Sequence, residues 1–302
     1  MTAGAGRSPG TSPSASDRAR SMTAEALEEL TEQLNSGKSD RLTAYLKAMG
    51  RFHAYSFGNV MLIASQRPDA TRVAGFKAWK SLGRSVKKGE QGIVIVAPMV
   101  LKGKQDADPN GIPGDEDKPR VRFRGVHVFD ISQTEGDELP EPARFGGDPG
   151  GALQRREAAV VDSGITLNTA EHLAGADGIS KGGEIVLCGS LEPAERFATL
   201  VHEWAHEMLH HGSKDERPSK TVRETEAEAV AFVVGHAIGL EASTASSDYI
   251  ALYRGDAETL MASMDRVQKT ACRIIEAIRD DKGKAVTIIT SHHASHAASR
   301  QR

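Results

Sequence analysis

The segment from Leu191 to His211 constrains the fold most, because its histidines are spaced for one face of a helix. It reads LEPAERFATLVHEWAHEMLHH. Ser190 is the predicted N-cap, and Pro193 falls in the first turn, where its missing N–H costs no hydrogen bond. His202 and His206 are four residues apart, about one turn, so both imidazoles can reach one ion. The segment therefore predicts a helix that offers two ligands to a metal.

Glu203 directly follows the first histidine and completes an HExxH pattern. In such sites zinc lowers the pKa of its water and polarises the scissile carbonyl, while the glutamate is the general base. The pattern predicts a zinc-dependent metallopeptidase-type site with Glu203 as its catalytic residue. The plainer alternative is a surface helix with incidental histidines. His210 and His211 close the helix, where cationic side chains suit its dipole.

A zinc site of this type needs a third protein ligand and an open fourth position. The next predicted helix, TVRETEAEAVAFVVGHAIGL, spans residues 221–240. Its first turns place Glu224 and Glu228 on one face, with Glu226 turned away. A solvated acidic first turn, favoured by the helix dipole, is the simpler interpretation. We predict Glu224 as the third ligand and Glu228 as a residue that orients a histidine. Spacing alone leaves the choice among the three glutamates open.

The sequences HEWAHEMLHH and RETEAEAVAF together resemble gluzincin-like peptidases of the ImmA/IrrE type. The second helix of that family carries a Glu-x-x-Ala-(Asp/Asn) pattern whose first Glu is the ligand. The resemblance implies that Glu224 has this role, and Glu228 stands where Asp or Asn is commoner. Residues 183–187 (GEIVL) are similar to the edge strand on which zincins lay an extended peptide substrate.

A basic, aromatic region precedes this part of the chain. Nine basic and two acidic residues lie between Arg67 and Lys104, although the whole chain has a net charge of −3. Aromatic residues interleave with them, and single-stranded bases stack on such rings while cations track the backbone. Alternatively, the rings belong to the core and the charges solvate one face. The aromatic residues concerned are Phe52, Tyr55, Phe57, Phe76 and Trp79.

Six short blocks in this region resemble the N-terminal single-stranded-DNA-binding domain of ArdC-type antirestriction proteins. They are YSFGN (55–59), QRPDAT (66–71), GFKAW (75–79), LGR (82–84), VKKG followed by GI (86–93) and VFDISQT (128–134). In that family a zincin domain follows, so the resemblance covers about residues 22–280. It implies single-stranded DNA as the partner and protection of incoming mobile DNA from restriction.

The motif blocks do not say which residues touch DNA. Our candidates are Tyr55, Asn59, Trp79, Lys80, Arg84, Lys87 and Lys88. We assign Phe76 to the core. A protein or peptide substrate is the second predicted partner, and Zn²⁺ is the predicted cofactor.

The predicted fold class is α+β, with an N-terminal α+β domain that binds single-stranded DNA and a C-terminal zincin-like metallopeptidase domain. Helical periodicity covers residues 22–50, with a break at 36–37, and recurs at 56–66 and 260–278. Residues 92–101 and 121–131 are predicted to form paired strands. The predicted organisation is a disordered tail (1–21), a DNA-binding domain (22–135), a linker (136–154), the metallopeptidase domain (155–285) and a flexible tail (286–302).

Composition excludes several other classes of protein. The chain has two cysteines and no CxxC pair, which argues against a disulfide-stapled domain and a thiolate zinc site. Residues 1–21 lack the apolar core of a signal peptide. No apolar run approaches the roughly 20 residues of a membrane span. We therefore expect a cytoplasmic protein with no membrane contact.

Overall fold

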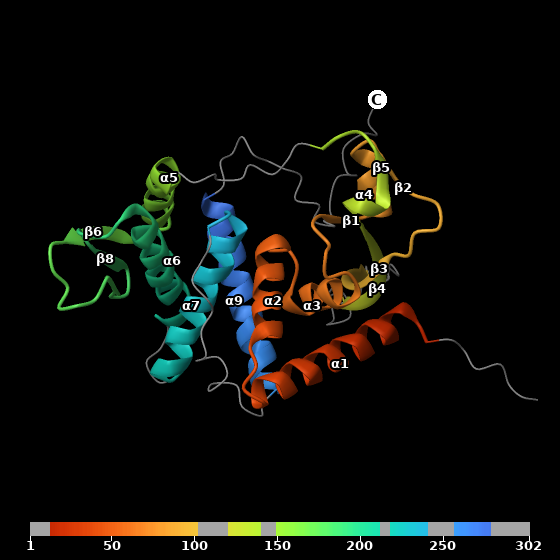
Figure 1. Cartoon of the computed structure of the whole chain (residues 1–302), viewed down its shortest axis with the longest axis horizontal. Coiled ribbons are helices and arrows are strands. Elements are labelled where there is room, and N and C mark those ends of the chain that lie inside the picture. The colour runs from red at the N-terminus through yellow and green to blue at the C-terminus, as the bar shows by residue number, and fades with distance from the viewer. Residues whose placement is uncertain (1–12, 102–119, 140–148, 212–217, 241–256, 279–302) are drawn as a thin grey trace, which may run out of the picture.

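The structure is a computed structural model that describes residues 13–101, 120–139, 149–211, 218–240 and 257–278. The predicted 286–302 tail and most of the charged 102–120 loop lie outside these ranges. Within them, helices and three small sheets give the predicted α+β class (Figure 1). None of the described helices combines the length and apolar character that a membrane span requires.

Three helices open the described chain: α1 (Ala15–Asn35), α2 (Asp40–Arg51) and α3 (Phe57–Gln66). Helix α1 begins seven residues before the predicted start at 22, because Ser14 and Asp17 form a reciprocal capping box at its N-terminus. The predicted disordered tail is therefore wrong for residues 15–21, and residues 1–12 lie outside the described ranges. Ser56 caps α3 as its side chain accepts from the Asn59 N–H.

Strands β1 (Val73–Gly75), β4 (Arg120–Asp130) and β3 (Ile93–Leu101) form an antiparallel sheet in the order β1-β4-β3. The predicted pairing of the two long strands is confirmed, with Ile93 opposite Val128. Helix α4 (Phe76–Ser81) follows β1. Strands β2 (Arg84–Val86) and β5 (Thr134–Gly136) form a separate antiparallel pair, reached from β4 through the 3-10 helix η2 (Ile131–Gln133).

The outer edge of β3 is satisfied by amide side chains of α3. Asn59 donates to the Val96 carbonyl at 2.8 Å and accepts from the Val96 N–H at 2.9 Å. Gln66 does the same for Val94, at 2.8 and 2.9 Å. An unpaired strand edge invites association with other chains, so these two residues close the sheet on that side.

The second part begins with α5 (Pro149–Asp162), which starts inside the predicted linker. A three-stranded sheet follows, formed by β6 (Thr166–Ala170), β7 (Gly178–Ser180) and β8 (Glu184–Cys188). Its order is β6-β8-β7, so β8 is the central strand. The prediction that residues 183–187 form the edge strand is wrong. The neighbour of β8 on one side is β7, which also packs against the next helix, α6 (Pro193–His210).

Helices from both halves share one apolar core. Helix α7 (Lys220–Ala237) packs against α6 on one side and α2 on another, and α9 (Ala257–Ile278) contacts α1, α3, α6 and α7 (Figure 1). Polar contacts join the halves as well. The buried amide of Gln268 donates to the His53 carbonyl at 2.9 Å, and Asp265 accepts from the Phe57 N–H at 3.3 Å. The division into two domains stays a prediction, while the packing around α7 and α9 is continuous.

Candidate metal centre

Helix α6 presents its apolar stripe to the core and its histidines to α7. Phe197, Leu200, Val201 and Trp204 are buried on it. Pro193 lies in the first turn as predicted. The predicted cap at Ser190 is wrong, because Glu192 is the N-cap and forms a capping box with Glu195. The helix ends at His210, so it carries both HExxH histidines well inside its length.

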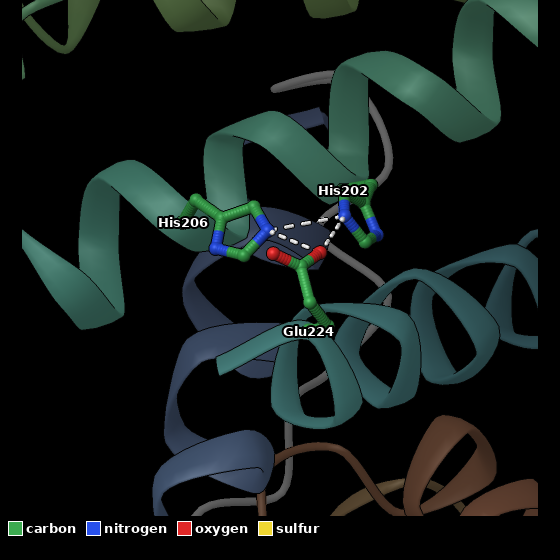
Figure 2. A group of neighbouring side chains, drawn as sticks. All are labelled: His202, His206 and Glu224. Carbon is green, nitrogen blue, oxygen red and sulfur yellow. Dashed lines mark hydrogen bonds and ion pairs between the residues drawn. The ribbon is translucent and has the colours of Figure 1, made fainter. Parts of the chain in front are cut away.

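His202, His206 and Glu224 converge, and their ligand atoms all lie within 4.8 Å of one another (Figure 2). Nε2 of His206 lies 3.1 Å from Nε2 of His202. Oε2 of Glu224 lies 3.4 Å from His202 Nε2 and 3.3 Å from His206 Nε2. Three side chains from two helices thus each bring one potential ligand atom to one small region.

These separations fit a metal ion. Two atoms held ~2.0–2.1 Å from zinc at the tetrahedral angle lie about 3.3–3.4 Å apart, close to the observed spacings. The donor set of two imidazoles and one carboxylate is that of many catalytic zinc sites, which keep an open fourth position. The Glu224 side chain is 48% exposed, so solvent can reach this side of the group.

The electrostatics favour ligand forms of the histidines. Burial lowers the pKa of His202, and the neighbouring His206 lowers it further, although Glu224 and Glu228 oppose the shift. Burial likewise lowers the pKa of His206 against the charge of Glu224. Neutral imidazole is the form that binds metals, so both side chains stay ready to coordinate near neutral pH.

Glu203 is on the same helix but turns toward strand β7. Its side chain is 8% exposed, and the backbone N–H of Ser180 donates to its carboxylate. Burial and then the charge of Glu224 raise the pKa of Glu203 to about 7. A carboxyl group with such a pKa can both hold and release a proton near neutrality.

Strand β7 comes very close to Glu203 because residue 178 is glycine. A Cβ atom on Gly178 would lie 2.7 Å from Cγ2 of Thr199 and 2.9 Å from Cγ of Glu203. Strand β7 is also tied to the end of α6, where Ser180 Oγ lies 2.9 Å from Nε2 of His211. Sequence reasoning missed this strand, since nothing local to residues 178–180 signals a contact with α6.

The three glutamates of α7 have different surroundings. Glu224 joins the histidines, while the exposed Glu228 lies near enough for its charge to raise the pKa of His202. Glu226 is fully buried and accepts hydrogen bonds from Ser263 and Arg266 of α9. The structure therefore brings Glu224 to the group and turns Glu226 away, as its position on the helix predicts. The role of Glu228 stays a prediction.

His210 does not act as a cation at the helix end. It is 3% exposed, and burial, with His206 next, lowers its pKa to about 4. Its Nε2 lies 3.8 Å from Oε2 of Glu226. The prediction of a charged His210 that suits the helix dipole is wrong, because the packing of α6 on α7 removes this ring from water.

Three of the predicted DNA-contact residues are instead buried or hydrogen-bonded to the protein backbone. Trp79 is 1% exposed and donates to the Phe129 carbonyl at 2.8 Å, so its ring offers no face for stacking. Asn59 is occupied with β3. The Tyr55 hydroxyl donates to the Val73 carbonyl at 3.3 Å, and burial raises the pKa of this phenol to about 12.

The basic candidates are placed differently. Lys80, Lys87 and Lys88 are exposed. Arg84 donates to Thr134 Oγ1 at 2.8 Å and to the Thr134 carbonyl at 3.1 Å. The assignment of Phe76 to the core is wrong, because its side chain is 55% exposed.

Fold and site together define an α+β protein with a His₂Glu candidate metal centre built on two helices. Residues 16–129 match the family model described as the N-terminal domain of the anti-restriction factor ArdC. This match covers the α1–α3 helices and the β1-β4-β3 sheet.

The fold is similar to that of a known protein over most of the chain. The metal-free crystal structure of antirestriction protein ArdC from plasmid R388 matches with a TM-score of 0.50 at 18% identity, covering 85% of this chain and 97% of that one. The Mn(II)-bound structure of the same protein matches with a TM-score of 0.49 at 18% identity, covering 86% and 99%.

An uncharacterized protein of Bacillus anthracis is 25% identical over 312 residues, which covers 89% of this chain. The chain spans about half the length of that relative, 53%.

Proposed function

We propose that this protein binds single-stranded DNA, protects incoming mobile DNA from restriction, and carries a zincin-like metallopeptidase site. The match of residues 16–129 to the ArdC N-terminal domain supports the DNA half. The convergence of His202, His206 and Glu224 is the observation that carries the metal half.

In this proposal His202, His206 and Glu224 hold one divalent ion, with zinc favoured by the nitrogen-rich donor set. A bound ion would supply Lewis-acid chemistry that polarises a substrate carbonyl. Glu203 would hold or take a proton at its carboxylate, which the Ser180 N–H orients. Glu228 would orient His202 through its nearby charge.

Metal analysis and titration test this arrangement. We expect the purified protein to bind about one zinc equivalent and to gain thermal stability with it, since a ligand that binds only the folded state stabilises it. His202→Ala and Glu224→Gln should each remove this gain, and chelation should lower the Tm of the wild type to that of the variants. Equal zinc-induced stabilisation in His202→Ala would contradict the site.

Glu203→Gln separates a peptidase from a binding protein with a structural metal. The substitution keeps the volume of the side chain but removes its basic carboxylate. We expect zinc binding to persist and protection of unmodified DNA in a restricting host to be lost. If protection survives, the protein acts by masking DNA, and the metal is structural.

The alternative hypothesis for an enzymatic function is a regulatory peptidase that cleaves a repressor-like partner. The resemblance of the two helices to ImmA/IrrE-type peptidases supports it. Its signature is one host or element protein that is shortened only when Glu203 is intact. DNA binding would then serve to localise the protease. Gel-shift titrations with single-stranded DNA, weakened steeply by salt, test the DNA half separately.

A further inference from the structure

Three large apolar side chains in the described part of the chain are exposed, and two of them are phenylalanines next to cations. Phe76 is 55% exposed and is followed by the exposed Lys77. Phe123 is 63% exposed between the exposed Arg122 and Arg124. The third is Val161 of α5. An exposed aromatic ring beside positive charge is the pairing that single-stranded nucleic acid uses.

Of these two exposed phenylalanines, Phe76 on helix α4 has the cationic neighbours that favour DNA binding more. Phe76 and Lys80 are four residues apart and share one face of the helix, with Lys77 alongside. All three side chains are exposed, whereas Trp79 turns inward to the Phe129 carbonyl. Phe76 and Trp79 are three residues apart and are neighbours on the surface of this short helix, yet Trp79 is buried and Phe76, the first residue of the helix, is exposed.

Strand β2, which packs against α4, and the residue after it add two cations whose side chains are held by hydrogen bonds. Arg84 is bound by the hydroxyl and carbonyl of Thr134 and by the carbonyl of Gly136 at 3.3 Å. Lys87 donates to the Ser132 carbonyl at 3.0 Å. These acceptors, and the Asp137 carbonyl to which Arg84 also donates, are neutral oxygens that orient the two cations. The carboxylate of Asp137 lies beside Gly83 and offsets part of the positive charge at Arg84.

The acidic residue of the partner strand lies on the other face of this two-stranded ribbon. Glu135 of β5 pairs with Ser85, and side chains alternate along a strand, so Glu135 and Arg84 point to opposite faces. Segment 76–88 itself contains five basic residues and no acidic one.

We infer that Phe76, Lys77 and Lys80 of α4, with Arg84 and Lys87, form the surface on which single-stranded DNA binds. Phe76 stacks on a base, Lys77 and Lys80 contact phosphates, and Arg84 and Lys87 provide fixed positive charge. This inference rests on the proposed DNA binding and names its site. The surface lies at the opposite end of the molecule from α6, so DNA and the metal-site helix do not compete for space (Figure 1).

The test is fluorescence anisotropy with the full chain and a labelled oligothymidylate of about 20 nucleotides, longer than the ~4–16-nucleotide sites of single OB-fold binding modules. Phe76→Ala should weaken binding by about 5- to 150-fold, the usual range for losing one stacked base. Phe76→Leu should lose as much, while Phe76→Trp should bind at least as tightly as the wild type. Because the ring is exposed, the Tm of all three should stay close to that of the wild type.

The lysine variants are distinguished by the salt dependence of DNA binding. Lys77→Ala/Lys80→Ala should reduce the slope of log K against log salt by about 1.4, since each phosphate contact to a single strand contributes ~0.7. Phe76→Ala should leave that slope unchanged. Phe123→Ala is the matched control, a phenylalanine that is also exposed and has basic neighbours, and it should bind like the wild type.

The outcomes separate this inference from the proposed function. If the wild type does not bind the oligonucleotide at low salt, the DNA-binding proposal itself fails. If the wild type binds and Phe76→Ala binds equally well, only the α4 surface is overturned. A loss confined to Phe123→Ala would also overturn it, because the stacking site would then lie on β4.

Discussion

Gly50 of α2 lies so close to Val233 of α7 that a Cβ atom at residue 50 would stand 2.9 Å from the Val233 carbonyl oxygen. The two backbones therefore touch where the family-matched N-terminal part meets the helix that carries Glu224. This contact makes the position of the metal-site helix dependent on the N-terminal helices.

Gly50→Ala should separate α2 from α7 and lower the free energy of unfolding by about 1–3 kcal/mol, the usual effect of overpacking. Urea denaturation measures the change. Gly58→Ala is the matched control, since its Cβ would meet only Met261 Cε at 3.5 Å in another helix. We expect the control to be neutral or stabilised by up to ~1 kcal/mol from its better helix propensity. Equal behaviour of the two variants would show that the close approach is not restrictive.

Gly178→Ala should displace the Glu203 carboxylate from the Ser180 N–H, because the added methyl occupies the space of Glu203 Cγ. Zinc titration should show an affinity near that of the wild type, whereas any Glu203-dependent cleavage or protection should fall by at least tenfold. Gly189→Ala is the control on the far side of β8, where a Cβ meets the Thr169 methyl at 3.3 Å. Unchanged Glu203-dependent function in Gly178→Ala would refute the positioning role of this glycine.

Glu226→Gln should affect mainly the stability of the fold, whereas Glu228→Gln should affect mainly the affinity for zinc. Glu226 is fully buried against Ser263 and Arg266, so its loss should cost about 1–3 kcal/mol of stability. Glu228 is exposed, and its loss should change stability by less than ~0.5 kcal/mol but weaken zinc binding by about 10–100-fold if it orients His202. Calorimetric titration and urea unfolding of both variants check the pair. Unchanged zinc affinity in Glu228→Gln would remove its assigned role.

Asn59→Ala should lower stability by about 1–3 kcal/mol, because it leaves the N–H and C=O of Val96 on β3 without their partners. Its affinity for single-stranded DNA, measured where the variant is fully folded, should match that of the wild type. Asn168→Ala, which loses only an exposed contact to Glu184, is the control. A folded Asn59→Ala protein with weakened DNA binding would restore Asn59 as a contact residue.

Acid should destabilise the protein partly through Asp130. Burial favours its neutral form, but the backbone N–H groups of Ser132, Thr71 and Arg72 outweigh this and lower its pKa below the usual 3.8. A lowered folded-state pKa gives stability that is fully present above about pH 4 and is lost as the pH falls through the folded value. Urea unfolding from pH 6 to pH 2 should show a smaller acid-dependent loss in Asp130→Asn than in the wild type. Asp69→Asn, at an exposed carboxylate, should follow the wild type.

Features that depend on local spacing can be predicted from the amino-acid sequence. His202 and His206 share a face because they are one turn apart, and that relation holds in any helix. The long strands and the helices at 57–66 and 257–278 follow from local periodicity and capping. Spacing leaves three glutamates open and the resemblance implies Glu224, and the fold brings Glu224 to the histidines.

Which side of each element faces inward depends on how the elements pack together. Trp79 and Phe76 sit three residues apart in one basic segment, and sequence cannot say which ring meets the Phe129 carbonyl and which meets water. The edge role of β7 and the neutrality of His210 likewise depend on partners from distant segments. Spacing is a property of the chain and can be predicted from sequence. Burial is a property of packing between elements, so it requires the tertiary structure.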